Sequence, residues 1–302
     1  MPSLEGLDVP DAILSTARYD PPLSSLDKNS LTQPSSAPSP YGLLAYHHDR
    51  LVQAAAAFAW TSAAQSLEGE QGLIKLRQRL DQAVSQWQTQ NDDKSDQPLR
   101  VSLPTMMLED EASYSVRWCT LPQLRILVFP TADDDDLITV QAFACNPITP
   151  ISNFFNLALA NPATLNALSS SSTFTYIPVR LDPARTSPSI WTQYKTTARD
   201  HYLASRERAG LGRDYNKPDE VLLFNQDDQV MEGSLANVGF YRDGAWVTPH
   251  DEAGGLNGVM RRWLLEQGRW KQGTILRGEV SRGEWVLLSN GLRGCFVGRI
   301  ES

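Results

Sequence analysis

The sequence predicts a mixed α/β (α+β) protein built from two domains. Its 302 residues are enough for two domains of ordinary size. Stretches with alternating apolar residues, typical of strands, and stretches with apolar residues at helical spacing occur in both halves. The polar run Leu168–Thr173 (LSSSST) lies between the halves. We therefore expect an N-terminal α/β domain over residues 1–168 and a C-terminal α/β domain over residues 169–302.

The N-terminal half begins with an expected strand at Ile13–Tyr19. The stretch that follows, Pro21–Pro40, is rich in Ser and Pro and is expected to be a solvated loop. Alanine-rich Tyr41–Trp60 and Glu70–Gln88, which has apolar residues at helical spacing, predict two helices. Four strand-like runs then occur between Leu99 and Phe143, namely RVSL, YSVRWC, LRILVF and ITVQAF.

The C-terminal half alternates helices and strands. Glycines are expected to end two of its helices, because glycine adopts the left-handed conformation that follows a helix. The expected elements are the strand Phe174–Leu181, the helix Trp191–Ala209 ended by Gly210, the strand Glu220–Phe224, the hairpin region Gln229–Pro249 with an Arg-Asp-Gly turn, the helix Gly258–Gln267 ended by Gly268, and the strands Trp285–Ser289 and Cys295–Ile300.

Composition argues against several functional classes. The formal net charge is -8, whereas a general nucleic-acid binder is more often basic. No apolar run approaches the length of a membrane span, and the N-terminus lacks the pattern of a secretory signal. The three cysteines have neither zinc-site spacing nor disulfide density, so a cytoplasmic protein is expected. The run Asp133–Asp136 is typical of a solvated hairpin tip, and we expect no metal site there.

The expected helix at Gly258 has an entrance suited to an anion. Asn257 is a candidate N-cap, and Gly258 would let a ligand approach the backbone. The free N–H groups of Val259 and Met260 would then point out of the helix end, which is a geometry that binds phosphate. An ordinary capped helix would carry the same residues, so this motif alone does not decide between the two interpretations.

Two further segments carry candidate cations. Lys195 is expected near the start of a helix, with Arg199 four residues later on the same face. A neighbouring cation lowers the pKa of a lysine, as a lysine that forms an imine requires. Arg50, in the run HHDRL, is a candidate fork for phosphate. The alternatives are a surface lysine and a solvated helix face.

These segments together resemble the class IV aminotransferases, the D-amino-acid and branched-chain aminotransferase-like pyridoxal-phosphate enzymes. The family order is a lysine, then E-G-x-x-x-N, then T-P, then x-G-[IV]-x-R. Here YKTTARD, EGSLAN, VTP and LNGVMR occur in that order. The resemblance implies fold type IV, with the active site in an interdomain cleft, and a homodimer. It covers Trp191–Ile300 well, while much of Pro98–Ser170 departs from the usual pattern.

The resemblance implies a role for each matching residue. Lys195 would carry pyridoxal 5'-phosphate covalently, and Glu232 would keep the pyridine nitrogen protonated. Gly233 would let the backbone pass close to the ring. Asn237 is expected to support the structure rather than to take part. The remaining implied cofactor contacts are Arg50, Val259, Met260, Asn290 and Arg199.

Three short motifs look more like a lyase of this family than like its transaminases. They are Asn257–Arg261 (NGVMR), Ser15–Arg18 (STAR) and Ser289–Gly294 (SNGLRG). The lyase converts 4-amino-4-deoxychorismate to 4-aminobenzoate and pyruvate, a step toward folate. In that reading Thr16 protonates or orients the leaving group, and Arg18 and Arg293 are candidate partners for substrate carboxylates. A transaminase acting on branched-chain or D-amino acids or amines is the alternative. A non-catalytic relative is a third hypothesis, against which the presence of both Lys195 and Glu232 argues.

Overall fold

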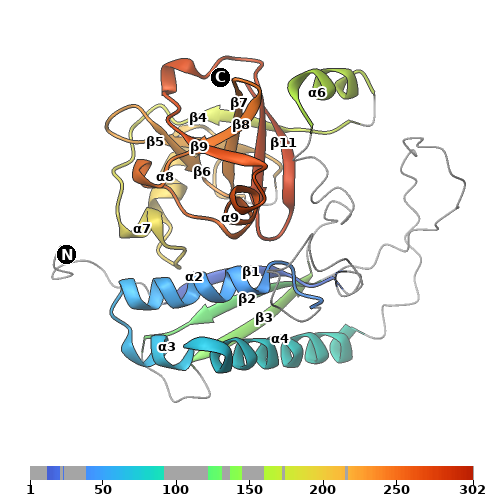
Figure 1. The fold of residues 1–302 in the computed structure, drawn as a ribbon, viewed down its shortest axis with the longest axis vertical. Helices are drawn as coiled ribbons and strands as arrows, with labels where there is room; N and C mark the ends of the chain where they lie inside the picture. The colour runs from blue at the N-terminus through green and yellow to red at the C-terminus, as the bar shows by residue number, and fades with distance from the viewer. Residues whose placement is uncertain are drawn as a thin grey trace, which may run out of the picture.

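The computed structural model describes residues 12–20, 23, 39–91, 122–130, 137–144, 160–171, 174–214 and 217–301. Two of the expected strands, RVSL and YSVRWC, lie outside the described residues, as do Asp133–Asp136 and most of the Ser- and Pro-rich stretch. The described elements form two bodies. Figure 1 shows the N-terminal elements below and the eight-stranded sheet of the C-terminal half above.

The N-terminal body is a three-stranded antiparallel sheet with helices packed on it. Its strand order is β1-β2-β3, and α2 contacts β1 while α4 contacts β3. The predicted helix over Tyr41–Trp60 is shorter than expected, because Leu43 and Ala59 adopt left-handed conformations with φ of 56° at its two ends. The elements are β1 (Ile13–Arg18), α2 (Leu44–Ala57), α3 (Thr61–Ser66), α4 (Gly69–Asn91), β2 (Pro122–Val128) and β3 (Ile138–Ala144).

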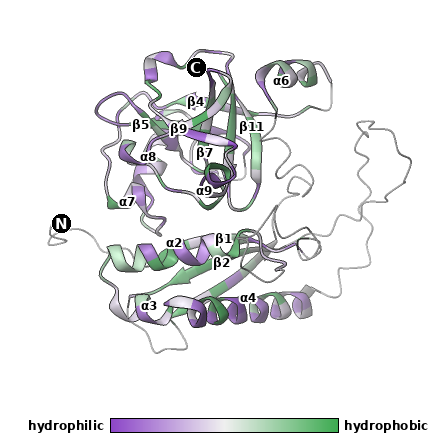
Figure 2. Ribbon diagram, in the orientation of Figure 1, coloured by the Kyte–Doolittle hydropathy of each residue, from purple (hydrophilic) through white to green (hydrophobic). Residues whose placement is uncertain are grey.

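Alternation along the strands gives this sheet one buried face. Leu124, Ile126 and Val128 of β2 are fully buried, and the residues between them are more exposed. Apolar residues at helical spacing on α4 pack into the same core, whereas its other residues are largely hydrophilic (Figure 2). Phe58 and Trp60 also lie in this core, so the apolar stretch around them packs within the N-terminal body.

The C-terminal body is an eight-stranded mixed sheet with the order β6-β5-β4-β11-β10-β7-β8-β9. β4 pairs in parallel with β5 and β11, and β8 with β9; the other neighbours are antiparallel. The strands are β4 (Ile177–Leu181), β5 (Glu220–Phe224), β6 (Val230–Gly233), β7 (Asn237–Arg242), β8 (Ala245–Pro249), β9 (Trp270–Gly273), β10 (Trp285–Asn290) and β11 (Gly294–Ile300).

The predicted hairpin divides into three strands. Asp243 and Gly244 both have positive φ in the turn between β7 and β8, as a two-residue hairpin turn requires. The preceding strand β6 pairs instead with β5. Strand β9 was not expected from the sequence. Four helices complete this half: α6 (Pro162–Ser169), α7 (Ile190–Gln193), α8 (Asp200–Arg208) and α9 (Val259–Glu266).

The two bodies meet where α9 approaches α2 (Figure 1). Arg262 of α9 donates to Asp49 of α2 at 3.2 Å, and the Tyr46 hydroxyl of α2 donates to Glu266 of α9. The Arg262 guanidinium also lies over the Tyr46 ring, 5.2 Å from its centroid. These contacts fix α9 relative to α2.

The single helix predicted over Trp191–Ala209 is wrong. The chain leaves α7 at Tyr194, runs extended past Lys195, and enters α8 only at Asp200. In between it pairs with β1: Leu14 N–H donates to the Lys195 carbonyl at 2.8 Å, and Thr197 N–H donates to the Ala12 carbonyl at 3.0 Å. This backbone pairing outcompetes helical hydrogen bonds, so Lys195 and Arg199 do not share a helix face.

The described residues lack two kinds of feature. None of the helices in those ranges is both long and apolar enough to cross a membrane. Nowhere in the same ranges do three His, Cys, Asp or Glu side chains come together as a metal ion would require.

Candidate functional site

Lys195 lies on the extended segment that pairs with β1, and it is half-buried beside several cations. Burial lowers the pKa of Lys195 well below its ordinary value, and Arg199, Arg50 and Arg125 lower it further. Glu232 acts in the opposite direction by stabilising the charged form. The net effect favours a neutral amine, which is the nucleophilic form of a lysine.

Glu232 is buried on β6, at the centre of a hydrogen-bond network. The Tyr202 hydroxyl of α8 donates to its Oε1 at 2.6 Å, and the Leu256 N–H also donates to the carboxylate. Burial raises the pKa of Glu232 to about 7, against the opposing effects of these donors and of nearby Arg199 and Lys195. A glutamate that merely began a surface strand would face water, so this placement favours a site role.

Arg199 is a structural clamp on the turn that follows Glu232. Its Nη2 donates to the Ser234 carbonyl at 2.8 Å, and its guanidinium lies 4.4 Å from the centroid of the Tyr202 ring. Buried Glu220 holds the same turn, because it accepts from the Ser234 hydroxyl at 2.6 Å and from Leu235 N–H at 3.0 Å. The turn that positions Glu232 is therefore fixed from two sides.

The glycines of this region are required by protein neighbours. A Cβ at Gly233 would lie 2.8 Å from Glu220 Cδ and 2.9 Å from the Ala236 carbonyl oxygen. A Cβ at Gly258 would lie 2.0 Å from Asn237 Oδ1. The sequence predicts that both glycines leave room for a ligand. In the structure, the atoms that a side chain at either position would meet belong to the protein itself. The Nδ2 of Asn237 donates to the Leu256 carbonyl at 2.6 Å, which agrees with its expected supporting role.

Within the described part of the chain the first turn of α9 has no side-chain cap, and Asn257 is not its N-cap residue. Gly258 is the N-cap and provides no side-chain hydrogen bond, while the Oδ1 of Asn257 accepts from Arg261. The side chains of Val259 and Met260 are buried in the core of the C-terminal half. Their N–H groups are the first of the helix and precede its backbone hydrogen bonds, so they remain available to an anion.

Arg50 and His47 of α2 lie beside this helix end. Arg50 Nη2 donates to the Ser15 hydroxyl at 2.6 Å, and Ser15 Oγ lies 2.7 Å from His47 Nδ1. Both side chains are buried, yet Arg50 Nε and His47 Nε2 have no hydrogen-bond partner among the described residues. Burial and the neighbouring Arg262 lower the pKa of Arg50 to about 10, at which it still carries its charge at neutral pH. His47 was not singled out by sequence reasoning.

Asn290, at the end of β10, shapes the turn opposite His47. Its Oδ1 accepts from the N–H groups of Leu292 and Arg293 at 3.1 and 2.8 Å, and its Nδ2 donates to the Leu235 carbonyl at 3.3 Å. A Cβ at the next residue, Gly291, would lie 2.7 Å from Val259 Cγ2 and 2.9 Å from His47 Cε1. Asn290 thus brings this turn against both α2 and α9.

Arg125 is a site residue that sequence reasoning missed. It pairs directly with Thr16 across β1 and β2, points to the exposed face of the sheet, and is close enough to lower the pKa of Lys195. The signal was present in the run LRILVF, where one arginine interrupts an apolar alternation and so must face away from the core. Thr16 and Arg125 place a hydroxyl and a guanidinium side by side near the lysine.

The two arginines predicted to bind substrate carboxylates have different surroundings. Arg18 is buried and bonded to Asp20, with Nε–Oδ2 and Nη2–Oδ2 distances of 3.1 and 2.7 Å. A carboxylate partner is therefore already present within the chain. Arg293 lies in the Asn290 turn, and its guanidinium is 5.8 Å from the centroid of the Phe296 ring.

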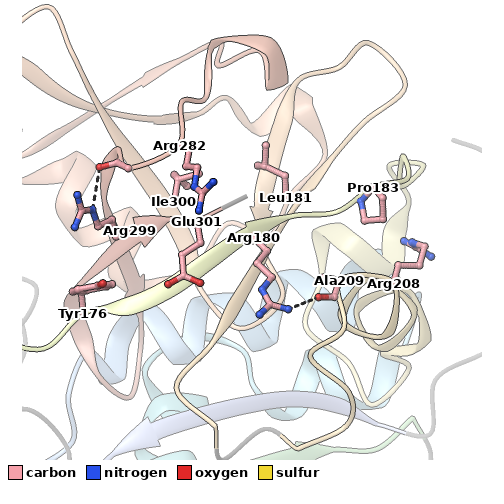
Figure 3. Close-up of a pocket in the computed structure, with 11 residues that line it drawn as sticks. Tyr176, Arg180, Leu181, Pro183, Arg208, Ala209, Arg282, Arg299, Ile300 and Glu301 are labelled. Atoms are coloured by element: carbon pink, nitrogen blue, oxygen red, sulfur yellow. Dashed lines mark hydrogen bonds between the residues drawn. The ribbon is translucent and has the colours of Figure 1, made fainter.

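A separate pocket of about 730 Å³ lies on the C-terminal body and contains none of the predicted site residues. Figure 3 shows arginines around it, from the ends of β4 and β11 and from α8. Most of them bond within the chain: Arg180 donates to the Ala209 carbonyl, Arg299 to the Gly283 carbonyl, and Arg208 to Asp182. These arginines thus mainly stabilise the fold through hydrogen bonds within the chain.

Comparison with known proteins gives one matching family model and two relatives that match part of the chain. The family model "Amino-transferase class IV" matches residues 36–299. An aminodeoxychorismate lyase of Saccharomyces cerevisiae is 34% identical over 128 residues, which are 38% of this chain and 34% of that protein. A protein of Schizosaccharomyces pombe is 37% identical over 102 residues, which are 33% of this chain and 43% of that one. The chain thus matches less than half the length of either relative.

Solved structures show the same fold at low sequence identity. The 4-amino-4-deoxychorismate lyase from Pseudomonas aeruginosa superposes with a TM-score of 0.54 at 15% identity, covering 97% of this chain and 83% of that one. The fold IV-transaminase CpuTA1 from Curtobacterium pusillum gives 0.53 at 15% identity, covering 97% and 79%. Because the match of the family model extends over most of the sequence, the chain belongs to the class IV aminotransferase family.

Proposed function

We propose that the protein is a pyridoxal 5'-phosphate-dependent lyase that converts 4-amino-4-deoxychorismate to 4-aminobenzoate and pyruvate in the cytoplasm. The observation that carries the choice of a lyase is Thr16, which lies on the strand paired with the Lys195 segment and beside Arg125. A lyase needs a group that protonates the departing enolpyruvyl oxygen, and a hydroxyl at this position supplies one. The lyase relative in yeast supports the same choice.

The described side chains fit pyridoxal 5'-phosphate at each of its ends. The Lys195 amine, whose pKa is lowered, suits its aldehyde, and the buried carboxylate of Glu232 suits its pyridine nitrogen. At the other end, the unpartnered Nε of Arg50 and the first N–H groups of α9 suit a phosphate. When bound, the cofactor supplies an electron sink for a carbanion formed beside the amine.

Each side chain of the site has its own role in the reaction. Lys195 removes the ring proton from the amine-bearing carbon, since its lowered pKa leaves the amine free to accept a proton. Glu232, held by Tyr202, keeps the proton on the pyridine nitrogen. Thr16 protonates or orients the leaving enolpyruvyl oxygen as the ring becomes aromatic. Arg125 binds a substrate carboxylate, a role that we assign to it in place of Arg18.

A transaminase of the same family is the alternative. The superposition with the Curtobacterium transaminase is as good as that with the Pseudomonas lyase. The family resemblance implies the same roles for the lysine and the glutamate in both reactions. A non-catalytic role has less support, because a family member that only bound partners would have no need of a lysine with a lowered pKa near a buried glutamate. Absorbance of the purified protein in the cofactor band separates that class from the other two.

The reaction is tested by product analysis. Supplied with pyridoxal 5'-phosphate and 4-amino-4-deoxychorismate, the protein should release 4-aminobenzoate and pyruvate in equal amounts without a 2-oxo acid acceptor. Chromatography with fluorescence detection follows the aromatic product. Amino-group transfer to a 2-oxo acid, with no 4-aminobenzoate formed, would show that the transaminase alternative is correct.

Lys195 is expected to be the cofactor lysine, because its surroundings lower its pKa and so favour the neutral, nucleophilic amine. Borohydride reduction of the loaded protein should fix the cofactor to the peptide that contains Lys195, as read by mass spectrometry. Lys195→Ala should abolish this labelling, whereas the matched variant Lys271→Ala, at an exposed position of β9, should retain it. Labelling of a different lysine in the wild-type protein would refute the assignment.

Glu232 is expected to set the electron sink. Glu232→Gln keeps the shape of the side chain and an acceptor for Tyr202, but it removes the charge that stabilises a protonated pyridine nitrogen. Turnover should fall by about 10²–10³-fold, the usual effect of losing one preorganised charge, with little change in cofactor saturation. The matched control Glu252→Gln changes an exposed glutamate and should behave as wild type. Unchanged turnover in Glu232→Gln would remove this residue from the mechanism.

We also propose that the active form is a homodimer, as the family resemblance implies. The apolar stretch from Ala54 to Trp60 does not support an interface, because Ala54, Phe58 and Trp60 are buried within one chain. Light scattering on fully active enzyme should give twice the monomer mass. A monomer mass under those conditions would contradict the proposal.

A further inference from the structure

We propose that His47 binds the phosphate group of the cofactor as a neutral imidazole, by donating a hydrogen bond from Nε2 alongside Arg50 Nε and the first N–H groups of α9. The inference rests on the proposed cofactor. It adds to the site a donor that neither the sequence motifs nor the comparisons assign.

The first step is the position of the His47 proton. The Ser15 hydroxyl accepts from Arg50 Nη2 at 2.6 Å, because a guanidinium can only donate. Ser15 is fully buried, and among the described residues its Oγ has one other partner, His47 Nδ1 at 2.7 Å. If Nδ1 carried a proton, the hydroxyl hydrogen of Ser15 would be left unpaired in the interior. The satisfied arrangement has Ser15 donating to Nδ1, which leaves the His47 proton on Nε2.

The second step is the absence of a protein partner for that proton. His47 has no exposed surface, and its Nε2 has no hydrogen-bond partner in the described part of the chain. Arg50 Nε, one helical turn away on the same face of α2, is in the same situation. Two neighbouring buried donors without acceptors are costly, so a shared acceptor is expected between them.

The third step is the direction in which His47 faces. A Cβ at Gly291 would lie 3.1 Å from His47 Nε2 and 2.7 Å from Val259 Cγ2, so the ring edge, the Gly291 turn and the first residue of α9 lie close together. This helix end has no side-chain cap. Backbone donors, one guanidinium and one imidazole thus lie in one region of the molecule, and the ligand class that fits such donors is a phosphate monoester.

The imidazole must stay neutral for this geometry. Burial lowers the pKa of His47 well below its ordinary value, and the charges of Arg50 and Lys195 lower it further. A neutral ring has one donor and one acceptor, which Nε2–H and Nδ1 provide here. Arg50 supplies the compensating positive charge, so His47 adds a directional donor without adding charge.

The test compares two isosteres. The carbonyl of Asn reproduces the Nδ1 acceptor but places no donor at Nε2, whereas Gln reaches further and can place its amide N–H near Nε2. His47→Asn should weaken binding of pyridoxal 5'-phosphate by about tenfold or more, as expected for one lost hydrogen bond to a charged group. His47→Gln should recover most of the affinity. Binding of pyridoxal, which lacks the phosphate, should be equal in wild type and both variants.

The matched control is His48→Gln, the same substitution one residue along α2. His48 Nε2 bonds to the Leu67 carbonyl at 2.7 Å, so this variant should bind pyridoxal 5'-phosphate as wild type does. Affinities are measured by fluorescence titration of the purified apo protein, and folding of each variant is checked by its thermal transition. Wild-type affinity for pyridoxal 5'-phosphate in folded His47→Asn would overturn the proposal, as would an equal loss of affinity for pyridoxal.

Inorganic phosphate separates this inference from the proposed cofactor. Phosphorus NMR line broadening should show phosphate binding to the wild-type protein and its loss in His47→Asn. If the wild type bound phosphate in this way but not pyridoxal 5'-phosphate, the proposed cofactor would be wrong while the phosphate site stood. If phosphate binding were the same in wild type and His47→Asn, the role of His47 would be refuted.

Discussion

The pairing of β1 with the segment around Lys195 is the contact on which the site depends. It joins the N-terminal sheet to the C-terminal half through backbone hydrogen bonds at Leu14 and Thr197. One strand therefore carries the hydroxyls of Ser15 and Thr16 on its two faces and holds the lysine backbone at its edge. Backbone pairing depends little on side-chain identity. The pairing of β1 with the Lys195 segment can therefore be kept while the side chains on β1 vary.

Opposite charges are distributed unequally around the lysine. Arg50, Arg125 and Arg199 all disfavour a charged amine at Lys195, and Glu232 is the carboxylate that favours it. Glu232 is in turn held by two neutral donors, Tyr202 O–H and Leu256 N–H, and these donors and two nearby cations partly offset the burial that raises its pKa to about 7. The resulting field favours a ligand with negative charge at its end near α2. At its other end, near Glu232, the same ligand should have a group that accepts a proton. That polarity matches a cofactor with a phosphate at one end and a pyridine at the other.

Much of this arrangement was predictable from the sequence, and the failures have specific causes. Strand alternation identified β1, β5, β10 and β11, and the helix-entry motif identified the free end of α9. The helix through Lys195 failed because a long-range partner, β1, competes for its backbone groups, and a single-sequence pattern does not show such a partner. Arg125 was missed because its importance comes from the register of β2 against β1. His47 was missed because its features, namely burial and an Nε2 without a hydrogen-bond partner among the described residues, are visible only in the structure.

The contact between Asn237 and Gly258 has a consequence for how such a chain diverges. The amide oxygen of Asn237 fills the volume that a side chain at position 258 would need. Its nitrogen meanwhile anchors the Leu256 carbonyl just before α9. In a lineage that changes one residue at a time, position 258 can accept a larger residue only after two other changes. Position 237 must first carry a smaller side chain, and another group must hold the Leu256 carbonyl in place of the Asn237 amide. The reverse order passes through an overlap of atoms, so the historical sequence of substitutions at these two sites has one permitted direction.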